Sequence, residues 1–278
     1  MRKQLLNLLG LAAVVALGAG VAFAQTAPGT GIYNTAHDLT TNPPTRSVPG
    51  FVKDGEQRLC AYCHTPHHAI LVGSAEANGA EYLPLWSHQV SNANYQMYAS
   101  PTFTPYGGQY PASDPLIGPS RLCMSCHDGV TGVDNYYGNT PNHNMVTPPG
   151  ASFESDPVIS TNGNSNHPIG FSAAEIWPGN PYNTVPATTD NFNLVPWSDT
   201  LSYKGNSNLN VTIKSRLYQG LYMTCGSCHD VHNQLNAGVS YDPNYPNFFT
   251  LGTQKTSGIC ISCHTQGGSG IPASAFQY

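Results

Sequence analysis

The eight cysteines of this 278-residue chain all fall into one pattern that occurs four times. In each copy, two residues separate two cysteines and a histidine directly follows the second. The copies are Cys60-Ala-Tyr-Cys63-His64, Cys123-Met-Ser-Cys126-His127, Cys225-Gly-Ser-Cys228-His229 and Cys260-Ile-Ser-Cys263-His264. Thiols at this spacing can form thioether bonds to the two vinyl groups of a porphyrin, and the adjacent imidazole can bind its iron. The pattern therefore predicts four covalently bound c-type haems, with His64, His127, His229 and His264 as proximal ligands.

Two other uses of the cysteines have to be weighed against haem attachment. Eight cysteines in an exported chain could form a disulfide framework, and four Cys-x-x-Cys pairs could hold two zinc ions. Neither arrangement requires a histidine after every second cysteine. Because the chain has only 11 histidines, four such coincidences are improbable, and haem attachment is the preferred interpretation.

The histidines outside the motifs decide what the irons could do. They are His37, His67, His68, His88, His143, His167 and His232. Seven spare imidazoles for four irons favour a second histidine on every iron, which leaves no open position for a substrate. Met97 and Met145 are the only methionines free to replace an imidazole, and methionine more often fills gaps in packing.

His67 and His232 each lie three residues after a proximal histidine. Residues three apart on a helix have Cβ atoms about 5–6 Å apart on the same side, so they cannot approach one iron from opposite faces. We therefore expect His67 and His232 to bind different irons from those of His64 and His229. This arrangement would bring neighbouring irons close together.

The start of the chain has the features of a secretory signal peptide. Arg2 and Lys3 precede an apolar run, and Ala22-Phe23-Ala24 forms a small-x-small cleavage site, so residues 1–24 are expected to be removed. A retained membrane anchor is the competing interpretation, and a short, Gly- and Ala-rich run disfavours it. Loss of the two basic residues changes the net charge from −5 to −7. An acidic chain of this kind does not suggest nucleic-acid binding, and no stable membrane insertion is expected.

Composition predicts an irregular fold for the remaining residues 25–278, a single tetrahaem cytochrome c domain. The chain contains 28 glycines and 23 prolines, more than a globular domain usually has. We expect mostly coil, with short haem-binding helices at the motifs, few strands, and a core packed around the porphyrins. Residues 210–214 alternate like a short strand.

Several strings resemble those of bacterial multihaem cytochromes from metal-reducing bacteria, in particular the tetrahaem OmcE-type cytochromes that form extracellular filaments. The matching strings include Asn34-Thr-Ala-His37-Asp38-Leu39, Cys63-His64-Thr-Pro-His67, Pro84-Leu-Trp86-Ser-His88, His167-Pro-Ile-Gly-Phe171 and Cys228-His229-Asp-Val-His232. The resemblance covers most of residues 34–264, except 172–220. It implies low-spin haems in stacked and T-shaped pairs. It also implies distal ligands from His37, His67, His88, His167 and His232, one more than four irons need. One distal histidine, expected to be His67, would be donated to the next subunit.

Three functions follow from these expectations. The first is electron transfer through four bis-histidine haems as part of an extracellular filament or outer-surface relay. The chain would then contact other copies of itself and redox partner proteins or an extracellular acceptor. The second is a soluble electron shuttle in the periplasm. The third is a multihaem reductase, which often carries an altered motif such as lysine in place of the proximal histidine. All four motifs here keep the histidine, which favours an electron carrier over an enzyme.

Overall fold

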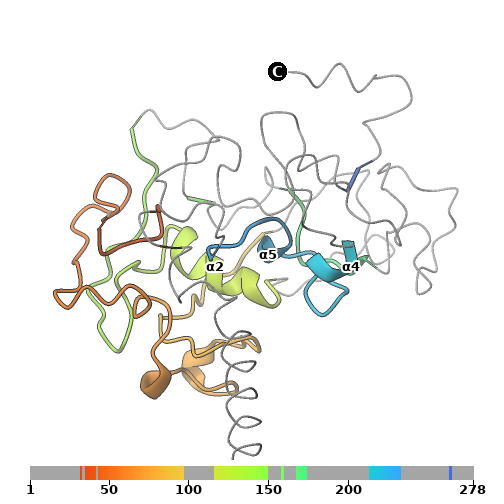
Figure 1. Cartoon of the computed structure of the whole chain (residues 1–278), viewed down its shortest axis with the longest axis horizontal. Helices are drawn as coiled ribbons and strands as arrows, with labels where there is room; N and C mark the ends of the chain where they lie inside the picture. Colours follow the sequence, from red (N-terminus) through yellow and green to blue (C-terminus); the bar gives the residue numbers. More distant parts are fainter. Residues whose placement is uncertain are drawn as a thin grey trace, which may run out of the picture.

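The computed structural model describes residues 32, 35–41, 43–96, 116–149, 158–159, 167–173, 213–232 and 263–264. In these residues the chain runs mostly through turns and loops, joined by isolated β-bridges and without a named strand. The helical elements are η1 (Pro66–His68), η2 (Ala75–Ala77), α2 (Pro119–His127), α4 (Ile213–Arg216) and α5 (Cys225–Cys228). The expectation of an irregular fold with a few short helices is confirmed for this part of the chain (Figure 1). The expected signal peptide, residues 1–24, lies outside it.

Helix α2 contains the whole second motif. It follows Gly118, whose positive φ of 55° is a conformation that glycine adopts without strain, and Pro119 occupies the first turn. A Cβ atom at position 118 would lie only 2.8 Å from the ring of Tyr218, so glycine also lets this ring pack closely. The helix ends at His127, and the backbone N–H of Asp128 donates to Met124 O.

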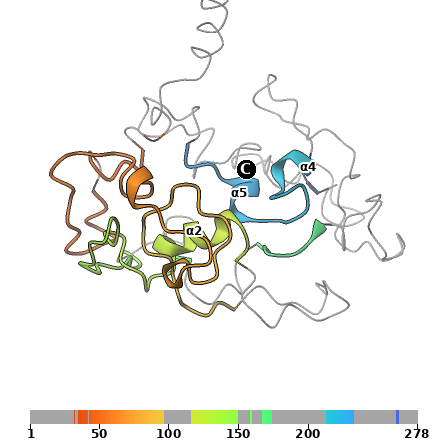
Figure 2. The ribbon, with the colours of Figure 1, turned by 90° about the horizontal axis from the view of Figure 1, so that it is seen from below.

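Helix α5 spans the two cysteines of the third motif. A capping box starts it, in which Thr224 N–H donates to Ser227 Oγ at 3.0 Å. The N–H of Cys225 donates to Ser120 Oγ on α2, also at 3.0 Å. Helix α5 packs against both α2 and α4, and these three helices lie together in two perpendicular views (Figures 1 and 2). Two motifs about 100 residues apart are thereby brought side by side.

The first motif and the expected strand differ from the sequence-based predictions. Residues 60–64 form a turn closed by His64 N–H donating to Cys60 O at 2.7 Å, rather than a helix. Residues 210–212 lie outside the described part of the chain, and Ile213 and Lys214 belong to helix α4. The strand prediction is therefore wrong at these two residues, because an apolar–polar alternation over five residues also fits one turn of helix.

The apolar core of the described residues is small. One cluster contains Ala80, Trp86, Val90 and Leu122 and borders Cys63. A second cluster contains Val48, Val133 and Met145 and borders Cys126. Across the described residues, 16 buried side chains are apolar and 17 are polar or charged, so apolar packing alone does not organise this fold.

Candidate functional site

The thiols of the first three motifs converge on one region. No two described cysteines are joined by a disulfide bond; Cys260 lies outside the described residues. Cys123 contacts Cys225 and is also close enough to Cys63 and Cys126 to interact with them electrostatically. Burial raises the pKa of Cys63 to about 12 and also raises the pKa of Cys126. These two thiols are therefore neutral at pH 7, and a buried neutral thiol is neither a good nucleophile nor a good zinc ligand.

Three motif histidines each face a histidine from elsewhere in the chain. The ring centroids of His127 and His37 lie 5.9 Å apart, with the planes at 55°. Those of His64 and His232 lie 6.3 Å apart at 29°, and those of His264 and His167 lie 6.3 Å apart at 67°. In each pair, one ring comes from a Cys-x-x-Cys-His motif and the other is one of the five candidate distal ligands.

This separation is the one that a metal between two imidazoles requires. A metal–imidazole bond is about 2 Å long, so two such bonds and the two ring radii place the centroids about 6 Å apart. Hydrogen bonds orient two of the rings for this role. His64 Nδ1 lies 2.6 Å from Pro84 O, and His167 Nδ1 lies 2.8 Å from Pro168 O. A carbonyl at Nδ1 fixes the tautomer and leaves the Nε2 lone pair for a metal.

Burial favours the neutral form of one histidine in each pair. Burial lowers the pKa of His37 to about 3, and the neighbouring His127, His229 and His232 lower it further. Burial also lowers the pKa values of His64 and His167. A neutral imidazole is the form that binds a metal. The influence of His229 on His37 also places the third motif near the ligand pair of the second.

His88 is in a different environment from the paired histidines. Its ring is fully buried, with Nδ1 2.9 Å from Gln89 O and Nε2 3.2 Å from Val133 O. Cys126 Sγ lies 3.4 Å from the same Nε2, and the ring of Trp86 lies 5.9 Å away. Within the described residues His88 has no ring contact with another imidazole. Of the five candidate distal ligands, His88 is therefore the one whose surroundings are those of a packed structural residue.

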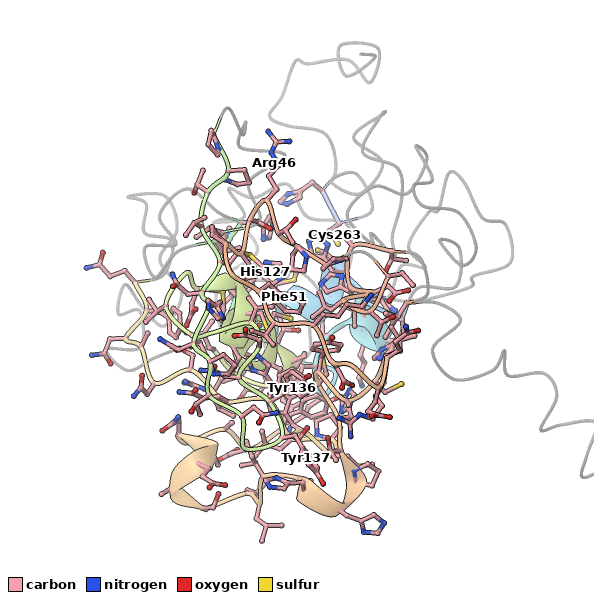
Figure 3. The ribbon with its side chains drawn as sticks, turned by 90° about the vertical axis from the view of Figure 1, so that its left-hand side faces the viewer. Arg46, Phe51, His127, Tyr136, Tyr137 and Cys263 are labelled. Atoms are coloured by element: carbon pink, nitrogen blue, oxygen red, sulfur yellow. The ribbon has the colours of Figure 1, made fainter. Side chains whose placement is uncertain are left out.

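His67 is exposed at the end of the short η1 turn. Across the described part of the chain it forms no hydrogen bond, ion pair or ring contact. The neighbouring His68 instead packs on Tyr137, with ring centroids 4.6 Å apart. Tyr137 lies toward the lower edge of the molecule in Figure 3, whereas His127 is surrounded by side chains near the centre.

The remaining candidates are held by other contacts. His143 Nδ1 lies 2.7 Å from the buried carboxylate of Asp134, and Met145 packs in the cluster with Val48 and Val133. Met97, Trp177 and Trp197 lie outside the described residues. Both described contacts agree with the expectation that these side chains contribute to packing and to the surface.

Sequence reasoning missed a set of buried carboxylates beside the histidines. Asp38 and Asp128 directly follow His37 and His127 and are 0% and 2% exposed. The signal that could have found them is a repeated His-Asp pair, which also occurs at His229-Asp230. The side chain of Asp230 is 45% exposed, however, so the dipeptide alone does not predict burial.

Asp54 organises the turn that leads into the first motif. Its carboxylate accepts N–H groups from Glu56 and Arg58 at 3.1 Å, and the Arg58 guanidinium donates to both oxygens at 2.9 and 3.1 Å. The hydroxyl of Tyr62, inside the motif, accepts the N–H of Asp54 at 2.8 Å. The hydrogen bond from Arg58 is the main reason that the pKa of Asp54 falls to about 2.

Asp54→Asn is expected to destabilise the protein by about 1–2 kcal/mol at pH 6, because an amide cannot replace both charged acceptor oxygens. A carboxyl group with a lowered pKa stabilises the fold above its unfolded pKa of about 3.9, and this contribution is lost as the pH falls toward 2. Urea unfolding at pH 6 and pH 3 should therefore give a smaller difference between variant and wild type at pH 3. An equal difference at both values would contradict the role of the charge.

No family model matches this chain, and no curated protein matches it either. Within the described ranges, no helix has the length and apolar character needed to cross a membrane. In the same ranges, no group of three or more His, Cys, Asp or Glu side chains is arranged to hold a metal ion. What the chain offers there is three pairs of imidazoles, and in each pair one histidine directly follows a cysteine.

Proposed function

We propose that this chain is a tetrahaem c-type cytochrome that transfers electrons, with the haem irons held between two histidines. The observation that carries the proposal is the set of three imidazole pairs with centroids 5.9–6.3 Å apart. Each pair joins a motif histidine to one that is distant in sequence. In all three pairs the partner is one of the candidate distal histidines, as two imidazoles on each iron would require.

The residues of the chain fit a covalently bound haem in three ways. Paired cysteines supply two thiols at the spacing of the two vinyl groups of one porphyrin. Backbone carbonyls of Pro84 and Pro168 orient two of the imidazoles. Apolar clusters border Cys63 and Cys126 and would cover the edge of a large apolar ring.

Two histidines on each iron favour electron transfer over catalysis. A bound haem supplies a one-electron iron couple whose potential depends on its axial ligands and surroundings. When imidazoles fill both axial positions, none is left for a substrate. The altered motif typical of multihaem reductases is absent from the sequence. A reductase is therefore the less favoured candidate.

The gathering of motifs supports transfer between haems within the chain. Cys63, Cys123, Cys126 and Cys225 come from three motifs and interact with one another. His37 is close to histidines from the second and third motifs and to His232, which faces His64 of the first. Redox centres that are this close can exchange electrons without a further carrier.

His67 supports an assembly of several copies. His67 is exposed on η1 and takes part in none of the three imidazole pairs. Leu71, Val72 and Leu85 near His67 are 73%, 60% and 53% exposed, and Leu85 O accepts the N–H of Thr65. We propose that this edge, drawn at the bottom of Figure 1, contacts the next copy and donates His67 to one of its haems in an extracellular filament.

The experiment that tests the proposal is a count of haems. Protein produced together with the c-type cytochrome maturation machinery should contain four haems per chain in a pyridine haemochrome assay. The oxidised protein should show the absorption spectrum of low-spin iron. A variant with Cys123→Ala and Cys126→Ala should contain three haems. Fewer than four haems in the wild-type chain would overturn the proposal, and a diffusible monomer with four haems would favour the periplasmic shuttle over the filament.

A further inference from the structure

Asp128 is a buried carboxylate at the end of α2, directly after His127. Its Oδ1 accepts the N–H groups of Val130 and Thr131, both at 2.8 Å. Its Oδ2 accepts the hydroxyl groups of Ser91 at 2.6 Å and Thr131 at 2.8 Å. The single hydroxyl hydrogen of Tyr95 lies between Ser91 Oγ at 2.5 Å and Oδ2 at 3.2 Å. Both carboxylate oxygens therefore have at least two donors each in the interior.

No cation neutralises this charge among the described residues. Asp128 takes part in no ion pair there, and the nearby guanidinium of Arg121 donates to Ser91 O at 3.4 Å. The carboxylate is close enough to Cys126 and His88 to interact with both electrostatically. Its negative charge therefore acts electrostatically on the residues around the second motif.

Asp38 places a second carboxylate beside the same imidazole pair. It directly follows His37 and is fully buried, and its Oδ1 accepts Thr40 N–H at 3.1 Å, Thr40 Oγ1 at 2.5 Å and Thr41 N–H at 3.1 Å. His37 faces His127, so each imidazole of this pair is followed by a buried aspartate. The other two pairs have no aspartate after either histidine.

We infer that Asp38 and Asp128 lower the reduction potential of the haem between His37 and His127. This haem then has the lowest potential of the four. The inference rests on the proposed function. A ferric haem carries one more positive charge than a ferrous haem. Fixed negative charges in a poorly polarisable interior favour the ferric state. Electrons entering the chain would therefore leave this haem more readily than the others.

The test is a potentiometric titration of the intact tetrahaem protein carrying Asp128→Asn. The lowest of the four midpoint potentials is expected to rise, and the other three should stay in place. A tenfold change in the ferric-to-ferrous ratio corresponds to about 59 mV for a one-electron couple, and the shift should be at least of this size. Asp38→Asn should move the same component in the same direction. Oxidised and reduced forms should also differ less in thermal stability in each variant than in wild type.

Asp54→Asn is the matched control, because Asp54 is also buried but its charge is paired with Arg58. It should leave the lowest potential unchanged. The haem content of both purified aspartate variants is measured on the same samples as the potentials. Four low-spin haems with unchanged potentials in Asp38→Asn and Asp128→Asn would overturn this inference and leave the proposed function intact. Loss of one haem from both variants would also overturn it, because the carboxylates would then be structural. A wild-type chain without haem would overturn the proposed function itself.

Discussion

Replacement of His232 by alanine is expected to turn one haem of the chain into a centre that binds carbon monoxide. His232 faces His64 with ring centroids 6.3 Å apart, and its removal would leave the iron of the first motif with one imidazole. A five-coordinate ferrous haem binds carbon monoxide rapidly, whereas a haem with two imidazoles does not. Stopped-flow mixing of the reduced variant with carbon monoxide should give one fast binding event per chain, and the oxidised variant should show a high-spin band.

His143→Ala is the matched control for this experiment. His143 is also a spare histidine, but its ring is held by the carboxylate of Asp134 at 2.7 Å. It should leave carbon monoxide binding at the wild-type level. His88→Ala should do the same if His88 is a structural residue packed against Cys126 and Trp86. Fast binding in His88→Ala and none in His232→Ala would show that the two ligand assignments must be exchanged.

Replacement of His67 by alanine is expected to abolish assembly into filaments. His67 is exposed on η1 and forms no hydrogen bond, ion pair or ring contact with other described residues, so its loss should leave the fold of the single chain unchanged. The donated ligand would be missing from every contact between copies. Negative-stain electron microscopy should show filaments for the wild type and single particles for the variant.

His68→Ala is the control for the filament experiment, because it removes the adjacent exposed histidine. His68 packs on Tyr137 within the same chain and should not be needed for assembly. Filaments formed by His67→Ala at the wild-type level would rule out donation of this side chain. Single particles of the wild-type chain would rule out the filament and leave the three histidine pairs within the chain unaffected.

The general character of the fold could be predicted from composition, but the shape of each motif could not. High glycine and proline contents exclude long helices, and the described residues contain only short ones. The second and third motifs are helical because Pro119 and the Thr224–Ser227 capping box start a turn there. The first motif lacks such a start and remains a turn. Over five residues, the spacing of apolar side chains does not distinguish a strand from a single helical turn, as Ile213 shows.

The same limit applies to the candidate site. Residues within a motif can be predicted from local spacing, whereas their partners depend on contacts between distant segments. The cysteines and the proximal histidines follow from spacing within five residues. The partner of each proximal histidine depends on tertiary contacts between distant segments, such as His64 with His232. His88 is an example, because its position between the carbonyl groups of Gln89 and Val133 depends on tertiary contacts that the sequence does not reveal. The burial of Asp38 and Asp128 cannot be predicted from the His-Asp dipeptides that contain them either.

The burial of the thiols has a consequence for biosynthesis. Cys63 and Cys126 border apolar clusters, and Cys225 lies against Cys123 across the contact between α5 and α2. An enzyme that attaches haem needs access to these sulfur atoms, and the apolar clusters and the contact between α2 and α5 partly cover them in the folded chain. Under the proposed function, we therefore expect haem attachment at both motifs to come before the two helices pack together. The chain would have to be kept open until both haems are in place.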